Sequence, residues 1–207
     1  MPYGYLGTTP NQQLNNSGVF SVEEALALQK VGELGGSLKF ISSSSMTSMS
    51  SAVDFTNCFT SKYDVYLLTT KEVQSDTNAY TVGIQFYESG TLEDSGVYNY
   101  SLQGGRTNGT FSEGRSTTEA WIHIGGDTDT DSTNSSNSYT YIYNPTNSSK
   151  YTFLTTQSTA QYDAVANFRF GGGVLPQAST VDGFRLRSTY STGQITGEFA
   201  LYGVKQI

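Results

Sequence analysis

Short segments in which apolar and polar side chains alternate follow one another from residue 36 to the end of the chain. The pattern is clearest where Tyr80, Val82, Ile84 and Phe86 share one side of an extended segment. A side-chain period of two indicates a strand with one buried face. Clusters of Ser, Asn, Gly and Asp separate these segments, and no helical pattern intervenes. We therefore predict an all-β fold, a jelly-roll-like antiparallel β-sandwich, over residues 36–207.

The expected strands cover most of this range. They are residues 37–42, 52–59, 63–73, 79–88, 96–102, 120–126, 138–144, 151–158, 166–172, 181–188 and 195–204. In the last segment Ile195, Phe199 and Leu201 fall on one face and Thr196 and Glu198 on the other, so we expect the C-terminal strand to be part of the sandwich. The chain has 15 Tyr and 11 Phe, so aromatic rings are expected to supply much of the core.

Residues 1–35 have a different character. A Gly-, Pro-, Asn- and Gln-rich arm precedes Ser21 and Glu24, which have the spacing of a capping box at the start of one short helix. We expect this segment to anchor the β-domain to a partner through scattered apolar side chains, namely Tyr3, Tyr5, Leu6, Phe20 and Leu26.

Charge and hydropathy exclude several classes of partner. The net charge is −7 and no basic stripe is visible, which argues against binding to nucleic acid or to an anionic membrane surface. The chain begins without a basic and apolar leader, and no run reaches the roughly 18 apolar residues of a membrane span. Cys58 is the single cysteine, so no intrachain disulfide forms, and we expect it to be a small buried hydrophobe.

Few patterns in the chain point to catalysis or metal binding. Asp127, Asp129 and Asp131 alternate and could offer three carboxylates to Ca²⁺, although they do not match an EF-hand loop, and a solvated loop is the other interpretation. His123 is the only histidine and lacks a nucleophile motif, so we expect a packing or hydrogen-bonding role. Carboxylates for glycoside hydrolysis could come from a wider set, Glu88, Glu93, Asp94, Glu113 and Glu119. We predict no enzyme activity, no catalytic residues and no cofactor.

Rows of tyrosine are the more informative pattern. Tyr139, Tyr141 and Tyr143 share one face of an expected strand. Trp121 lies on the expected strand that precedes it in the sequence. Exposed rings of this kind bind protein partners or stack on sugars, whereas buried ones form a core or a cross-strand ladder. These four residues are our candidates for an interface or binding surface.

Two long segments resemble a known group of proteins. DFTNCFTSKYDVYLLTTKEVQSDTNAYTVGIQFYESG, and the closing STVDGFRLRSTYSTGQITGEFALYGVKQI, resemble segments of virion structural proteins of tailed bacteriophages, especially marine ones. NSSKYTFLTTQS and FRFGGGV, which lie between them, are similar to the same group. The resemblance covers roughly residues 51–207, and its closing segment is the most distinctive part.

The resemblance implies a function as well as a fold. It implies a jelly-roll-like domain on the exterior of the virion, often trimeric, in tail fibres or other head and tail appendages, with no catalytic residues. We therefore expect a non-enzymatic structural protein, either a capsid decoration or a tail appendage, that is made in the host cytoplasm and released by lysis. Other virion proteins and two further copies of this chain are the expected partners. The alternative is a receptor-binding or carbohydrate-binding tip for host attachment that recognises a surface glycan.

Overall fold

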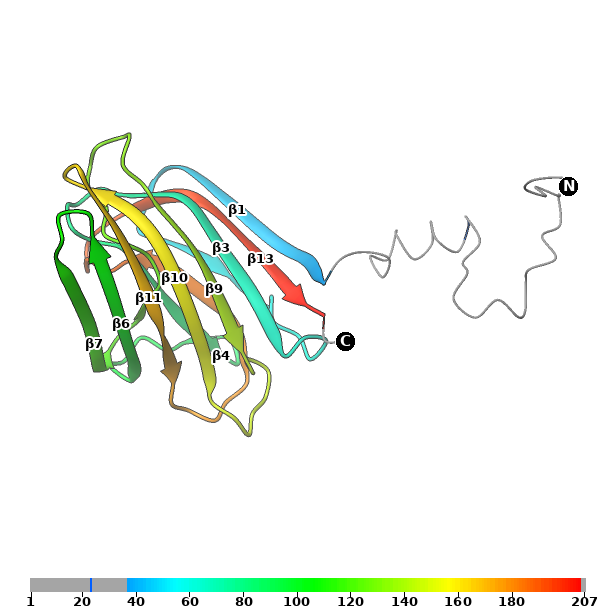
Figure 1. Ribbon diagram of the computed structural model, residues 1–207. Helices are drawn as coiled ribbons and strands as arrows, with labels where there is room; N and C mark the ends of the chain where they lie inside the picture. The colour runs from blue at the N-terminus through cyan, green and yellow to red at the C-terminus, as the bar shows by residue number, and fades with distance from the viewer. Residues whose placement is uncertain (1–22, 24–36, 206–207) are drawn as a thin grey trace, which may run out of the picture. The chain divides into compact units, whose positions relative to one another are not determined.

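The computed structural model describes residues 37–205, together with Glu23. In this part of the chain, strands form two antiparallel sheets that pack as a sandwich (Figure 1). The strands are β1 (Leu38–Ser50), β2 (Ala52–Phe55), β3 (Val65–Ser75), β4 (Val82–Glu88), β5 (Thr91–Leu92), β6 (Tyr98–Arg106), β7 (Phe111–Glu119), β8 (Ile122–His123), β9 (Ser136–Tyr143), β10 (Thr152–Tyr162), β11 (Val165–Leu175), β12 (Val181–Ser188) and β13 (Ile195–Val204). The predicted helix and the anchoring residues Tyr3, Tyr5, Leu6, Phe20 and Leu26 lie outside the described residues.

The order of the strands is that of a jelly roll. The larger sheet runs β1-β13-β3-β9-β10-β11-β6-β7, and the smaller runs β2-β12-β4-β5, with β8 paired to β4. β1 to β4 alternate between the two sheets, and the last strand, β13, lies between β1 and β3 in the larger sheet. β10, β11, β6 and β7 then extend the larger sheet beyond β9. The predicted jelly-roll-like β-sandwich is confirmed.

Aromatic rings pack against one another in the space between the sheets. Phe55 and Phe184 stack with their centroids 4.8 Å apart, and Phe59 meets Tyr66 edge to face at 4.7 Å. Each ring taken out of water contributes on the order of 2 kcal/mol. The buried Tyr66 hydroxyl donates to the backbone carbonyl of Thr60 at 2.7 Å, so its polar end is satisfied. Within the described residues, eight of the 22 buried core residues are aromatic and thirteen are Ile, Leu or Val, so rings supply a large share of the core but not most of it.

The C-terminal strand is part of this core. Ile195, Phe199 and Leu201 of β13 are almost completely buried, whereas Glu198 is exposed, as the alternation predicts. Cys58 is also buried, and its thiol donates to the carbonyl of Phe55 at 3.4 Å. Burial raises the pKa of the Cys58 thiol to about 12, so it stays protonated and behaves as a small hydrophobe.

Part of the interior is polar, and hydroxyl groups bond one another there. Thr140 on β9 meets Thr156 on β10 at 2.9 Å, and Thr70 on β3 meets Ser138 on β9 at 2.8 Å. The Thr156 hydroxyl also lies 3.0 Å from the carbonyl oxygen of Ile124. Because these pairs satisfy each other, Ser and Thr can occupy buried positions in strands that look polar in the sequence.

The edges of the sheets differ most from the sequence prediction. β1 continues eight residues past the expected end at residue 42, to Ser50, and β7 and β5 were not expected. β1 and β7 are the two edges of the larger sheet, and their sequences, LKFISSSSMTSMS and FSEGRSTTE, are mostly polar. Polar and charged side chains protect an edge from pairing with other chains, so such a strand lacks the apolar alternation that identifies an inner strand. Residues 120–126 pair as a strand only at Ile122–His123.

Candidate functional site

The outer face of the larger sheet, which points away from the smaller sheet, carries a broad array of apolar side chains. The register places Tyr143 opposite Val65 on β3 and Phe153 on β10, and places Tyr141 opposite Leu67 on β3. We call this array the outer aromatic face. Its first row is Leu38, Val204, Val65, Tyr143, Phe153 and Val174, its second row is Phe40, Tyr202, Leu67 and Tyr141, and its third row includes Tyr139 and Phe170.

The rings of this face are accessible. Phe40 is 55% exposed, and Tyr139 and Phe153 are each 45% exposed. Tyr139, Tyr141 and Tyr143 share this face because β9 points Thr140 and Ile142 inward between them. By contrast, Tyr98 and Tyr100 on β6 point inward, and Tyr98 is completely buried. Sequence alternation placed each tyrosine row on one face of its strand but could not determine which face is buried.

Contacts across the strands hold the tyrosine rings in place. The Tyr139 hydroxyl donates to Oε1 of Gln157, and the Tyr143 hydroxyl lies 3.1 Å from that of Thr155. Tyr139 and Tyr141 meet edge to face with centroids 6.2 Å apart. Side chains that are already ordered lose less conformational entropy when a partner binds.

Charge is confined to the margins of the outer aromatic face. Between β1 and β11, the first two rows of the described register contain no charged side chain. Lys71 and Glu198 lie further along the sheet and form an ion pair at 3.3 Å. An apolar centre with charges at the rim is typical of protein–protein interfaces.

Trp121 is not part of this surface. Its ring lies over β4 of the smaller sheet, so close that a Cβ on Gly83 would be 2.9 Å from it, and the Arg187 guanidinium lies 4.8 Å from its centroid. Trp121 therefore covers the face of β4 that points away from the core, and Gln85 on that face is buried. The structure therefore brings Tyr139, Tyr141 and Tyr143 together but leaves Trp121 on the other sheet.

The three alternating aspartates point to different partners. Asp129 accepts hydrogen bonds from the side-chain amide of Asn134 and from the backbone N–H groups of Asp131 and Asp163. Burial raises the pKa of Asp129, but these hydrogen bonds outweigh it and hold the pKa below its ordinary value. Asp127 pairs with arginines instead, and Asp131 accepts from Thr133. Within the described residues no three His, Cys, Asp or Glu side chains form a group that could hold a metal ion.

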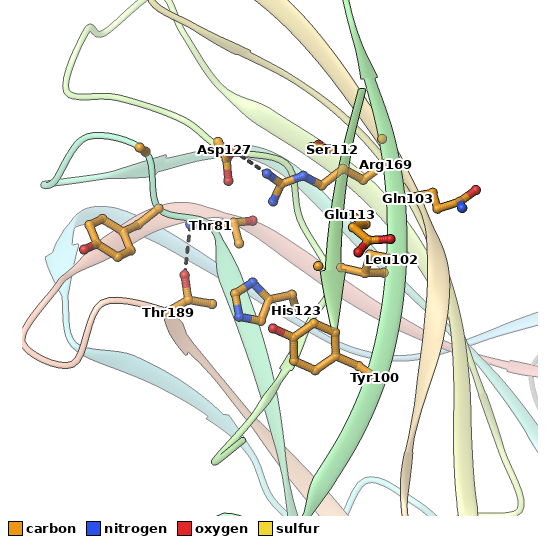
Figure 2. A pocket seen from close by; sticks show the side chains of 14 residues that line it. Thr81, Tyr100, Leu102, Gln103, Ser112, Glu113, His123, Asp127, Arg169 and Thr189 are labelled. Carbon is orange, nitrogen blue, oxygen red and sulfur yellow. Dashed lines mark hydrogen bonds and ion pairs between the residues drawn. The ribbon is translucent and has the colours of Figure 1, made fainter. Parts of the chain in front are cut away.

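A cleft lies beside the smaller sheet, under the inner face of the extended part of the larger sheet (Figure 2). Its volume is about 300 Å³. Tyr100 and Gly104 of β6, Gly114 of β7 and Arg169 of β11 line one side, and His123 of β8 lies opposite them. The two glycines add no side chain to this wall of the cleft. A Cβ on Gly104 would lie only 2.7 Å from a backbone oxygen, so a larger residue is excluded there. A Cβ on Gly114 would have space, because its nearest atom would be 3.7 Å away.

Electrostatics in the cleft centre on two groups. The Asp127 carboxylate accepts from the guanidinium groups of Arg169 and Arg106, the latter at 3.2 Å. His123 stacks on Tyr100 with centroids 4.9 Å apart. Burial, with a smaller contribution from the Arg169 charge, lowers the pKa of His123 to about 4, so the imidazole is neutral at physiological pH.

The sequence indicated only part of this cleft. His123 has the packing role expected of it. Glu113, one of the carboxylates considered for hydrolysis, borders the cleft through β7, but its side chain is exposed on the outer face of the sheet, opposite Gln103. Tyr100, Gly104, Gly114 and Arg169 carried no signal, because the cleft forms only when β6, β7, β8 and β11 are brought together.

Comparisons with protein-family models, curated proteins and solved structures find no match to this chain. In the part of the chain that the structure describes, no helix is long and apolar enough to cross a membrane.

Proposed function

We propose that this chain is a non-enzymatic structural protein on the exterior of a tailed-phage virion, and that it forms a homotrimer through the outer aromatic face. The outer aromatic face is the observation that carries the proposal. The resemblance of residues 51–207 to virion proteins supports the location, as a capsid decoration or a tail appendage, with anchoring by residues 1–35.

The dimensions of the face suit a subunit interface. Six strands about 4.8 Å apart and three rows about 7 Å apart give roughly 25 by 20 Å, or on the order of 500 Å² in projection. Protruding rings increase the accessible area. A threefold ring would divide this area between two neighbours, so each contact would be smaller than the ~800 Å² per partner of a standard interface and the two together would be comparable to it. Exposed apolar surface of this extent is uncommon on a monomer and marks an interaction site.

A second copy of the chain suits this face better than a charged partner. The chain has a net charge of −7, so two copies repel each other unless their contact excludes charge. The charge-free first and second rows meet that requirement. In a threefold ring, the part of the face on β1, β13 and β3 would pack against the part on β9, β10 and β11 of the next protomer.

Copy number in purified particles tests the virion assignment. Quantitative mass spectrometry would measure the number of copies of this protein relative to the major capsid protein. Particles would be purified from infections that produce either the full chain or a variant lacking residues 1–35. We expect the full chain to be present in a multiple of three, in hundreds of copies for a capsid decoration and in a few for a tail appendage. The truncated variant should be missing from particles but still fold. Absence of the full chain from particles would contradict the virion assignment.

A further inference from the structure

The cleft between His123 and the extended part of the larger sheet has the properties of a ligand site, and this inference does not depend on the proposed assembly. Its volume of about 300 Å³ lies at the lower end of the range for small-molecule pockets, roughly 300–1,000 Å³. The occupant must therefore be small, such as one ring of a larger molecule.

Charged groups in the lining are already paired. Arg169 and Arg106 share the Asp127 carboxylate. Glu113 pairs with Arg115 at 3.7 Å, and both of these side chains are exposed on the outer face of β7, away from the cleft. The neutral His123 adds no charge. A charged ligand would have to break one of these pairs, whereas a neutral ligand can use the remaining donors and acceptors without doing so.

The cleft also offers an unused polar group. Thr81 lines the cleft with a side chain only 3% exposed, and its buried hydroxyl has no hydrogen-bond partner among the described residues. Figure 2 shows the Thr81 side chain on the side of the cleft across from Arg169. A buried hydroxyl without a partner is unusual and costs free energy unless a ligand or solvent completes it. A ligand hydroxyl could both donate to this oxygen and accept from it.

Aromatic rings border the polar groups. Tyr100 and His123 form a stacked pair, and Tyr80 on the other side meets Tyr190 with centroids 4.7 Å apart. Flat apolar rings beside paired charges and hydroxyls suit a molecule that has both a C–H face and many hydroxyl groups. We propose that this cleft binds a single neutral saccharide unit, with its ring against Tyr100 and its hydroxyls bonded to Thr81 and Arg169.

Proton NMR on the full chain can test this directly, because His123 is the only histidine and its imidazole signals report on the cleft. The probes are the methyl glycosides of glucose, galactose, mannose and N-acetylglucosamine, with methyl glucuronoside as the charged comparison. We expect at least one neutral glycoside to shift the His123 signals saturably, with millimolar affinity, and glucuronoside to bind more weakly.

Gly114→Val should weaken that binding by about tenfold or more, because the side chain enters the cleft from a position with space around it. Ser112→Val, also in the lining, is the second variant if Gly114→Val does not fold. Ser101→Val, an exposed position on the opposite face of β6, is the matched control and should bind like the wild type. The proposal is overturned if no neutral glycoside moves the His123 signals, if glucuronoside alone binds, or if the cleft variant binds as tightly as the control.

Discussion

Acidification should destabilise the protein through His123, and the substitution His123→Gln should remove this part of the pH dependence. The unfolded chain binds a proton at His123 with a pKa of about 6.5, whereas burial beside Tyr100 and Arg169 lowers the folded pKa to about 4. Between these values the unfolded state holds more protons, so the free energy of unfolding falls as pH falls. From about pH 7 to about pH 5 the loss due to this residue is roughly 2 kcal/mol.

Urea unfolding followed through the single tryptophan, Trp121, measures this loss. Wild type and His123→Gln would be compared at the two pH values and at one protein concentration. Carboxylates with lowered pKa, such as Asp54 and Asp129, titrate below this window and cancel in the difference. We expect the wild type to lose about 2 kcal/mol more than the variant. Equal losses, or an NMR titration of His123 centred near 6.5, would refute the reasoning.

Two further substitutions test other contacts. Tyr98→Phe removes a buried hydroxyl that donates to the backbone carbonyl of Glu93 at 2.9 Å and accepts from the backbone N–H of Phe86 at 2.8 Å. It should lower the free energy of unfolding by about 1–3 kcal/mol; an unchanged urea midpoint would contradict this. Asp54→Asn weakens the two-pronged pair with Arg185, at 2.7 and 2.8 Å, and should cost about 1 kcal/mol after allowance for solvent screening. Because hydrogen bonding to Arg185 lowers the pKa of Asp54, this contribution is present above about pH 4 and is lost below it; a cost that persists at about pH 2 would exclude the ion pair as its source.

The inner strands could be predicted because their two faces differ. In β13, Ile195, Phe199 and Leu201 alternate with polar residues, and all three are buried as expected. β7 could not be predicted in this way, because an edge strand over a polar cleft needs no apolar side. The buried face of β10 is equally hard to detect from the sequence. Its residue Thr156 is polar, and it can be buried because its hydroxyl bonds that of Thr140.

The candidate surfaces depend on strand pairing, which the alternation of side chains does not encode. The sequence shows that Tyr139, Tyr141 and Tyr143 share a side, but only the register with β3 and β10 adds Leu67 and Phe153 to the same surface. Proximity in sequence also misleads in places. Trp121 precedes the tyrosine strand by fewer than twenty residues, yet it covers the smaller sheet.

The two proposed surfaces are compatible with each other. The outer aromatic face lies on one side of the larger sheet, and the cleft is lined by inner-face residues such as Tyr100 and Gly114 on the other side. A trimer formed through the outer aromatic face therefore leaves the cleft open to small molecules, and each protomer would present one.

The mass of the full chain in solution tests the central claim most directly. Sedimentation velocity would compare wild type with Tyr141→Lys, which places a charge in the second row of the face, and with Tyr190→Lys, an exposed tyrosine elsewhere. Burying an unpaired ammonium costs several kcal/mol, enough to dissociate the assembly. We predict a trimer for the wild type and for Tyr190→Lys, and a monomer for Tyr141→Lys. A monomeric wild type, or a Tyr141→Lys variant that remains trimeric, would contradict assembly through the outer aromatic face.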